Sequence, residues 1–121
     1  MNYDPMNLKP FSVSIEEATG GTIIVVLHGE LDIATTPAAE EKLREQENDG
    51  AEVIVLDLRG LTFIDSTGLR LLVAADSRAR EAGHRLAIAR GPEAVHRVLE
   101  ITGLDGKLDL IGDPAELQAA W

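Results

Sequence analysis

Hydrophobic and polar residues alternate where the patterned part of the chain begins. Phe11, Val13 and Ile15 are apolar and the residues between them are polar, which is the two-residue period of a half-buried β-strand. Residues 19–22, Thr-Gly-Gly-Thr, break this pattern, and their glycines can supply the positive φ angles of a hairpin turn. The next run, residues 23–27, is continuously apolar, as in a strand covered on both faces. The pattern therefore predicts a β-hairpin.

One helix and one strand are expected next. Residues 28–32 leave the hairpin, and Thr36-Pro37 then offers an N-cap followed by proline at the first helical position. A helix is expected over about residues 37–47. Residues 53–58 form a second apolar run that should be a central strand, and residues 61–64 are a short apolar segment that follows a glycine.

A second, longer helix is expected to open at Asp65-Ser66-Thr67-Gly68. It should run to about Ala82, and Gly83 is placed to end it. Its first half, residues 69–75, is apolar almost all round and is expected to be buried. Its second half carries charges and should emerge into solvent.

The rest of the chain predicts four shorter elements. They are a strand over residues 86–89, a helix that starts at Gly91-Pro92 and ends at Gly103, a strand over residues 108–111 and a closing helix. The closing helix should begin with a capping box at residues 113–116, and it offers Leu117 and Trp121 for burial.

The order of elements is β-β-α-β-α-β-α-β-α, which predicts the α/β class. A hairpin feeds a mixed, mostly parallel sheet, and the three middle helices supply the crossovers that parallel strands need. A chain of 121 residues is expected to form one domain. We interpret residues 1–10 as an N-terminal tail and residues 11–121 as the domain.

Composition limits the kinds of site. Aromatic residues make up only 3% of the chain, so the core must be aliphatic. The sequence has no cysteine, which excludes disulfides and thiolate metal sites and fits a reducing compartment. His28, His84 and His96 lack the close spacing of zinc ligands, so no metal is expected.

Charge and hydropathy limit the kinds of partner. The net charge of -10 argues against nucleic acid, because binding a phosphate backbone needs lysine and arginine. A basic protein surface is the more suitable complement. The sequence has neither an apolar run of about 18 residues nor a recognisable secretory signal. A cytoplasmic protein without membrane contact is therefore expected.

The segment Asp65-Ser66-Thr67-Gly68 carries the candidate chemistry. Asp65 as a helix cap followed by ordinary first-turn residues is one interpretation. The other is that Ser66 is a phosphorylation site, because two hydroxyls follow an acid where a buried strand meets a buried helix, and Gly68 leaves room for approach. A phosphate would add about −1.5 to −2 charges, which helix N-terminal amides can accommodate and a docked partner cannot.

The run VIVLDLRGLTFIDSTGL, from Val53 to Leu69, resembles the signature of the STAS domain in bacterial anti-sigma factor antagonists. The segment His28-Gly29-Glu30-Leu31-Asp32 is similar to the second characteristic segment of that family. The resemblance extends over about residues 11–121 in element order and length. It implies the STAS fold.

The resemblance also implies a partner-switching role. In that family the unphosphorylated antagonist binds an anti-sigma factor that is also a serine kinase, and a sigma factor is freed. The kinase phosphorylates the antagonist with its own bound ATP, so no cofactor is expected in this chain, and a serine phosphatase reverses the reaction. Ser66 matches the phosphorylated position, with Thr67 as the fallback acceptor. The residues that match partner-facing positions are Asp32, Asp65, Ser66, Thr67, Gly68 and Leu69.

Three other functions compete with this one. A serine hydrolase would need glycine two residues before the nucleophile, where this chain has Ile64, so catalysis is not expected. A phospho-acceptor receiver domain would alternate strictly between strands and helices and would carry a lysine after its last strand. This chain starts with a hairpin, and its Lys107 comes before the last predicted strand. The third alternative stays open. It is a non-phosphorylated STAS scaffold or sensor in a transport, lipid-trafficking or stress-signalling assembly.

Overall fold

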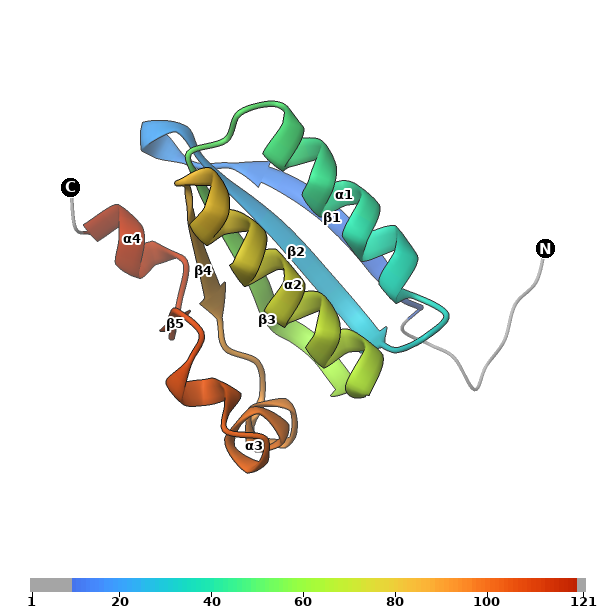
Figure 1. Ribbon diagram of the computed structural model, residues 1–121. Helices are drawn as coiled ribbons and strands as arrows, with labels where there is room; N and C mark the ends of the chain where they lie inside the picture. The colour runs from blue at the N-terminus through green and yellow to red at the C-terminus, as the bar shows by residue number, and fades with distance from the viewer. Residues whose placement is uncertain (1–9, 120–121) are drawn as a thin grey trace.

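The computed structural model describes residues 10–119, which fold around one five-stranded sheet (Figure 1). The strand order is β1-β2-β3-β4-β5, with β1 antiparallel to β2 and the other pairings parallel, so the predicted mixed sheet is confirmed. The strands are β1 (Ser12–Glu17), β2 (Thr22–Leu31), β3 (Val53–Ile64), β4 (Arg85–Ala89) and β5 (Leu110–Ile111). A short 3₁₀ turn, η1 (Thr19–Gly21), closes the hairpin, and Gly20 and Gly21 have φ angles of 73° and 77°, as predicted.

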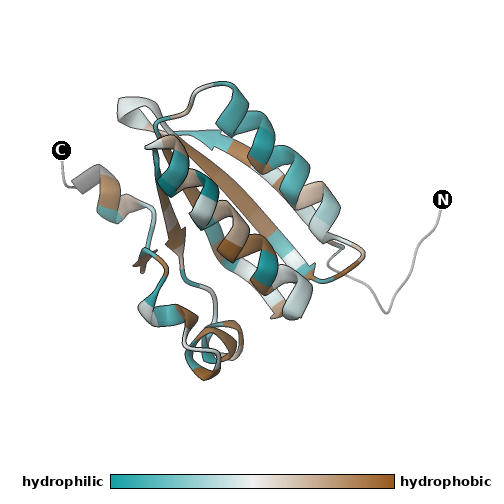
Figure 2. Ribbon diagram, in the orientation of Figure 1, coloured by the Kyte–Doolittle hydropathy of each residue, from teal (hydrophilic) through white to brown (hydrophobic). Residues whose placement is uncertain are grey.

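Helices connect the parallel strands. They are α1 (Thr36–Asn48), α2 (Ser66–Ala82), α3 (Glu93–Ile101) and α4 (Ala115–Ala119), with a 3₁₀ turn, η2 (Leu104–Gly106), after α3. Helices α1 and α2 lie side by side over one face of the sheet (Figure 1). The central strand β2 is strongly hydrophobic and α1 is largely hydrophilic, as expected for a sheet covered by amphipathic helices (Figure 2). No helix in the described part of the chain is long and apolar enough to cross a membrane.

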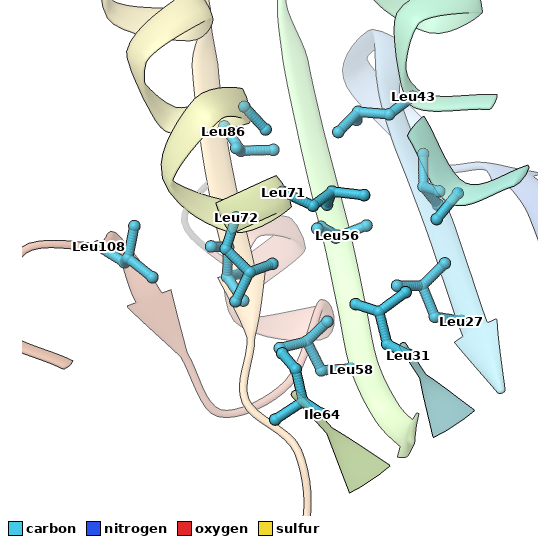
Figure 3. Packing of buried hydrophobic residues seen from close by; sticks show 14 of the residues in the cluster. Leu27, Leu31, Leu43, Leu56, Leu58, Ile64, Leu71, Leu72, Leu86 and Leu108 are labelled. Atoms are coloured by element: carbon cyan, nitrogen blue, oxygen red, sulfur yellow. The ribbon is translucent and has the colours of Figure 1, made fainter. Parts of the chain in front are cut away.

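The main core lies between the sheet and the helices α1, α2 and α3. Leu27 of β2, Leu56 and Leu58 of β3 and Leu72 of α2 are fully buried in it (Figure 3). Full burial of one leucine side chain contributes about 1.5–3 kcal/mol, so aliphatic contacts account for the stability of this layer. A smaller cluster on the other face of the sheet packs Leu117 of α4 against β3 and β4, which confirms the predicted burial of Leu117.

Strands β2 and β3 extend further than their apolar runs predict. The pairing of β2 with β3 continues to Leu31 and Ile64 through two register shifts, between Val26 and His28 and between Gly29 and Glu30. At each shift β3 contributes one extra residue, which is the pattern of a β-bulge. The prediction that the second strand ends at residue 27 is therefore wrong.

Gly60 lies inside β3, where a break between two segments was expected. A Cβ atom at this position would lie 2.3 Å from His28 Nδ1 and 2.8 Å from the Leu27 carbonyl oxygen. Only glycine allows β2 and β3 to approach so closely here. The predicted segments 53–58 and 61–64 are thus parts of one strand of 12 residues.

Helix α2 has the predicted limits but not the predicted burial. It ends at Gly83, which adopts a left-handed conformation with φ 81°. Leu71, Leu72 and Ala75 are buried, whereas Arg70, Val73 and Ala74 are exposed. The expectation that residues 69–75 are buried all round is wrong, because α2 packs on the sheet with one face and no described element covers the other.

An arginine joins α1 to α2. Arg78 Nε and Nη2 donate to the two carboxylate oxygens of Glu47 at 2.8 and 3.0 Å, and Nη1 lies 2.9 Å from Glu40 Oε1. The hydrogen bonds to Glu47 raise the pKa of Arg78, although partial burial opposes the effect. Because these side chains are at most 25% exposed, the cluster fixes the spacing of the two helices.

Helix α4 begins at the capping box that the sequence predicts. Asp113 N donates to Glu116 Oε2 and Ala115 N donates to Asp113 Oδ1, both at 2.7 Å, which confirms the capping box. Strand β5 is shorter than predicted, because the amide of Leu108 donates to the Leu104 carbonyl of η2 and not to a neighbouring strand. Trp121 and all but the last residue of the predicted tail lie outside the described residues.

Candidate functional site

Strands β2 and β3 end side by side and bring two distant segments together. Leu31 pairs with Ile64, and the amide of Asp65 donates to the Leu31 carbonyl at 3.2 Å. Asp32 and Asp65 therefore leave the sheet next to one another. The two segments that the sequence singled out form one site at the carboxyl edge of the sheet, beside the start of α2.

Asp65 is the N-cap of α2. Its extended backbone places Oδ1 2.8 Å from the amide of Thr67 and 3.1 Å from the amide of Gly68, and both donate to it. The interpretation of Asp65 as a helix cap is confirmed. These two amides are not available to a phosphate on Ser66, contrary to our expectation that the helix N-terminus would hold it.

Ser66 is the first residue of α2 and is exposed. Its hydroxyl makes no hydrogen bond with any other residue between 10 and 119. Because Asp65 satisfies the helix end, the Ser66 side chain has no structural role in the described chain. Its hydroxyl is open to another protein.

The three residues after Ser66 are less accessible. Thr67 and Leu69 are half-buried and Gly68 is buried. A Cβ atom on Gly68 would lie 2.7 Å from Ile64 Cγ1 and 3.1 Å from Leu31 Cδ2. The glycine thus allows α2 to pack on the ends of β2 and β3, and it does not serve to clear the surface for a partner.

Asp32 holds the loop between β2 and α1. Its Oδ1 accepts hydrogen bonds from the amides of Ala34 at 2.9 Å and Thr35 at 3.1 Å. Thr35 Oγ1 donates to the Glu30 carbonyl at 2.7 Å, and Thr36 Oγ1 donates to the Asp32 carbonyl. The N-cap of α1 is thus Thr35 and not Thr36 as predicted, and the Asp32 carboxylate is engaged in its own turn.

Large apolar side chains are exposed in the segments next to Ser66 and further along α2, at positions that the sequence did not predict. Ile33 is 77% exposed in the turn after Asp32, Phe63 is 47% exposed near the end of β3, and Val73 is 41% exposed on α2. Two signals could have found the first two. Ile33 is an isolated apolar residue in a polar loop, and Phe63 precedes the apolar Ile64 in a strand, where neighbours point to opposite faces.

A shallow apolar groove of about 440 Å³ runs between α1 and α2 beside Ser66. Its walls include Ile33, Pro37, Thr67, Arg70 and Ala74. The groove arises from helix packing, so no local pattern in the sequence predicts it. It extends the exposed apolar surface from the loop before α1 onto α2.

The site shows no arrangement for catalysis in the described part of the chain. Ser66 donates no hydrogen bond to a histidine between residues 10 and 119, and within that range His84 Nδ1 and His96 Nδ1 are buried without hydrogen-bond partners. A serine nucleophile needs a base within hydrogen-bond reach. The same residues contain no group of three or more acidic, histidine or cysteine side chains that could hold a metal ion.

Comparisons with known proteins agree with this geometry. The family model of the STAS domain matches residues 14–117. An anti-sigma-B factor antagonist of Staphylococcus aureus is 36% identical over 80 residues, which are 66% of this chain and 74% of the relative. An anti-sigma-F factor antagonist, RsfB, of Mycobacterium tuberculosis is 30% identical over 97 residues, 79% of each chain. The crystal structure of an anti-sigma factor antagonist from Mycobacterium paratuberculosis is similar with a TM-score of 0.82 and 26% identity, covering 92% of this chain and 93% of the other.

Proposed function

This chain belongs to the STAS domain family, and from that premise we propose that it is an anti-sigma factor antagonist switched off by phosphorylation of Ser66. The unphosphorylated form binds an anti-sigma factor that is also a serine kinase, and this binding frees a sigma factor. The kinase phosphorylates Ser66, and a serine phosphatase removes the phosphate. The switch operates in the cytoplasm, where the kinase finds ATP.

The observation that carries this proposal is the exposed hydroxyl of Ser66, which makes no hydrogen bond with another residue between 10 and 119 and lies beside an exposed apolar surface. Ile33 and Phe63 lie exposed in the segments next to the start of α2. Covering exposed apolar surface is a main favourable term in protein association. A protein that docks on these side chains would also cover Ser66, so its affinity would depend on whether Ser66 is phosphorylated.

The chemistry needs no group from this chain other than the hydroxyl. Ser66 Oγ attacks the γ-phosphorus of ATP held by the kinase, the bond to the bridging oxygen breaks, and ADP leaves. The hydroxyl proton passes to a base on the kinase. The phosphatase directs water to the phosphorus and releases inorganic phosphate. Thr67 is the fallback acceptor, but its side chain is half-buried and lines the groove.

Phosphorylation would weaken docking through charge and hydration. The phosphate brings about −1.5 to −2 charges next to the Asp65 carboxylate. A partner covering Ile33 and Phe63 would have to strip water from this dianion, and desolvation of an unpaired charge is strongly unfavourable. The fold itself stays intact, because the Ser66 side chain projects from the surface and Asp65 continues to cap α2.

Phosphate mapping and binding with purified proteins test the proposal. The chain is incubated with kinase-type anti-sigma factors and ATP, and phosphopeptides are mapped by mass spectrometry. Phosphate is expected on Ser66. In binding assays Ser66→Ala should keep wild-type affinity, whereas Ser66→Asp should lose at least about tenfold, which is 1.4 kcal/mol.

Asp49→Ala is the charge control, because Asp49 lies after α1 at the opposite end of that helix from the site. It should leave binding unchanged. Equal affinities of Ser66→Ala and Ser66→Asp, with no phosphate on residue 66, would reject the switch. The STAS scaffold or sensor that binds without phosphorylation would then be the better description.

A further inference from the structure

Arg70 is a cation beside the proposed phosphorylation site, and it has no ion-pair partner among residues 10–119. Arginine side chains elsewhere among residues 10–119 pair with carboxylates, namely those of Arg44, Arg59, Arg78, Arg80, Arg85 and Arg97. Arg70 is exposed and has no ion pair or hydrogen bond from its side chain within that range, a property it shares with Arg90. Arg70 therefore has its guanidinium available.

The position of Arg70 on α2 places it next to Ser66. The two residues are four positions apart in one helix, and side chains with this spacing lie on the same face with Cβ atoms about 5–6 Å apart. An acidic group four residues before a basic one is the favourable order for such pairs. A phosphate on Ser66 would lie within reach of the guanidinium, which can donate two parallel hydrogen bonds to phosphate oxygens.

The other charged groups near this position are acidic. Asp65 precedes Ser66 and Asp32 leaves the neighbouring strand. Glu40 of α1 lines the opposite wall of the groove, where it already pairs with Arg44 and Arg78. The amides of Thr67 and Gly68 are bound to Asp65. A phosphate here would thus depend on Arg70 for its compensating charge.

We propose that Arg70 closes onto phosphorylated Ser66 as an intramolecular latch. This inference rests on the proposed phosphorylation of Ser66. The latch holds the phosphate against α2, at the mouth of the groove between α1 and α2, and it withdraws the Arg70 side chain from that groove. The modified residue and its own cation together cover part of the docking surface, so phosphorylation changes the surface without moving a helix.

The test places phosphoserine at position 66 during translation by codon reassignment, so that no kinase is needed. The phosphate is titrated by ³¹P NMR at low salt in the wild-type chain and in Arg70→Gln. The midpoint of the titration should lie about 0.2–0.4 pH unit lower in the wild-type chain, because the guanidinium favours the dianion. Arg70→Lys should give an intermediate midpoint, and the difference should shrink in about 1 M salt.

Arg80→Gln is the matched control. It removes the same charge from the same helix, but Arg80 lies about 21 Å along the axis from Ser66 and pairs with Asp76. This control should keep the wild-type midpoint. Equal midpoints in wild type and Arg70→Gln, or an equal change in Arg80→Gln, would overturn the latch.

The two proposals can fail separately. If the anti-sigma factors do not phosphorylate Ser66 but the titration depends on Arg70, the latch chemistry holds and the proposed regulation does not. If Ser66 is phosphorylated and binding is lost while Arg70→Gln has no effect on the midpoint, the switch holds and the latch is rejected. The unphosphorylated Arg70→Gln chain should melt like wild type, because the Arg70 side chain makes no ion pair or hydrogen bond with another residue of the described range.

Discussion

Replacing Asp65 with alanine should destabilise the first turn of α2, the helix that presents Ser66. The substitution removes the acceptor of the amide hydrogens of Thr67 at 2.8 Å and Gly68 at 3.1 Å. Gly68 is buried, so water cannot freely replace the lost acceptor at its amide. The helix start is therefore expected to fray.

The magnitude follows from these contacts. Loss of an N-cap costs about 0.5–2 kcal/mol, and loss of a negative charge at a helix N-terminus costs about 0.3–1 kcal/mol. Because one of the two amides is buried, we expect a value of about 2 kcal/mol for Asp65→Ala. Asp65→Asn keeps an oxygen at the same position and should lose less than about 1 kcal/mol.

Urea unfolding followed by far-UV circular dichroism measures these free energies by linear extrapolation. Ser66→Ala, which removes an exposed hydroxyl without a hydrogen bond in the described chain, serves as the neighbouring control and should cost less than about 0.5 kcal/mol. Equal losses for Asp65→Ala and Asp65→Asn would refute the assignment of the stability to cap hydrogen bonds. So would a loss in Ser66→Ala as large as that in Asp65→Ala.

Other substitutions test the core, the Arg78 cluster between α1 and α2, the loop after β2 and the start of α2. Leu72→Ala should destabilise by about 3 kcal/mol in urea unfolding, because the side chain is fully buried; a loss below about 1 kcal/mol would contradict that burial. Arg78→Ala should cost about 1–2 kcal/mol, and because the pKa of Arg78 is raised, its contribution is complete below the ordinary arginine value and lost only above it. The cost should thus be equal at about pH 6 and pH 9, and a cost that disappears at the higher value would refute the assignment. Asp32→Asn keeps the acceptor of the turn and should melt like wild type, so a loss of anti-sigma factor affinity in this variant would identify the charge as the partner's contact, and unchanged affinity would exclude it. Gly68→Val should cost about 2 kcal/mol by overpacking, whereas Gly106→Val, where a Cβ meets nothing within 4 Å, should be tolerated; similar costs would refute the packing role of Gly68.

Local signals in the sequence were sufficient to predict where α2 starts and where it ends. Asp65 caps the helix and Gly83 ends it, because capping depends on residues within one turn of the helix end. The length of β3 could not be predicted in the same way. Gly60 has the appearance of a break, and its place inside a strand depends on the approach of His28 from the neighbouring strand.

The surface around Ser66 was predicted only in part. The sequence pointed to Asp32 and Ser66, but it gave no sign that the Asp32 carboxylate is occupied by its own turn. The groove arises from the packing of α1 beside α2. Whether an arginine such as Arg70 finds a partner depends on which carboxylates the fold brings close to it, and that information is spread over the whole chain.

The second bulge between β2 and β3 gives the site a spare residue. Leu61 pairs with Gly29 and Phe63 pairs with Glu30, so Thr62 is the extra residue of this bulge. Deleting Thr62 would therefore leave Phe63 and Ile64 paired with Glu30 and Leu31 in an unbroken ladder. Ile64 would still face the core, and Asp65 would still emerge beside Asp32. A single codon lost at this position would thus shorten the strand and leave the recognition surface in place.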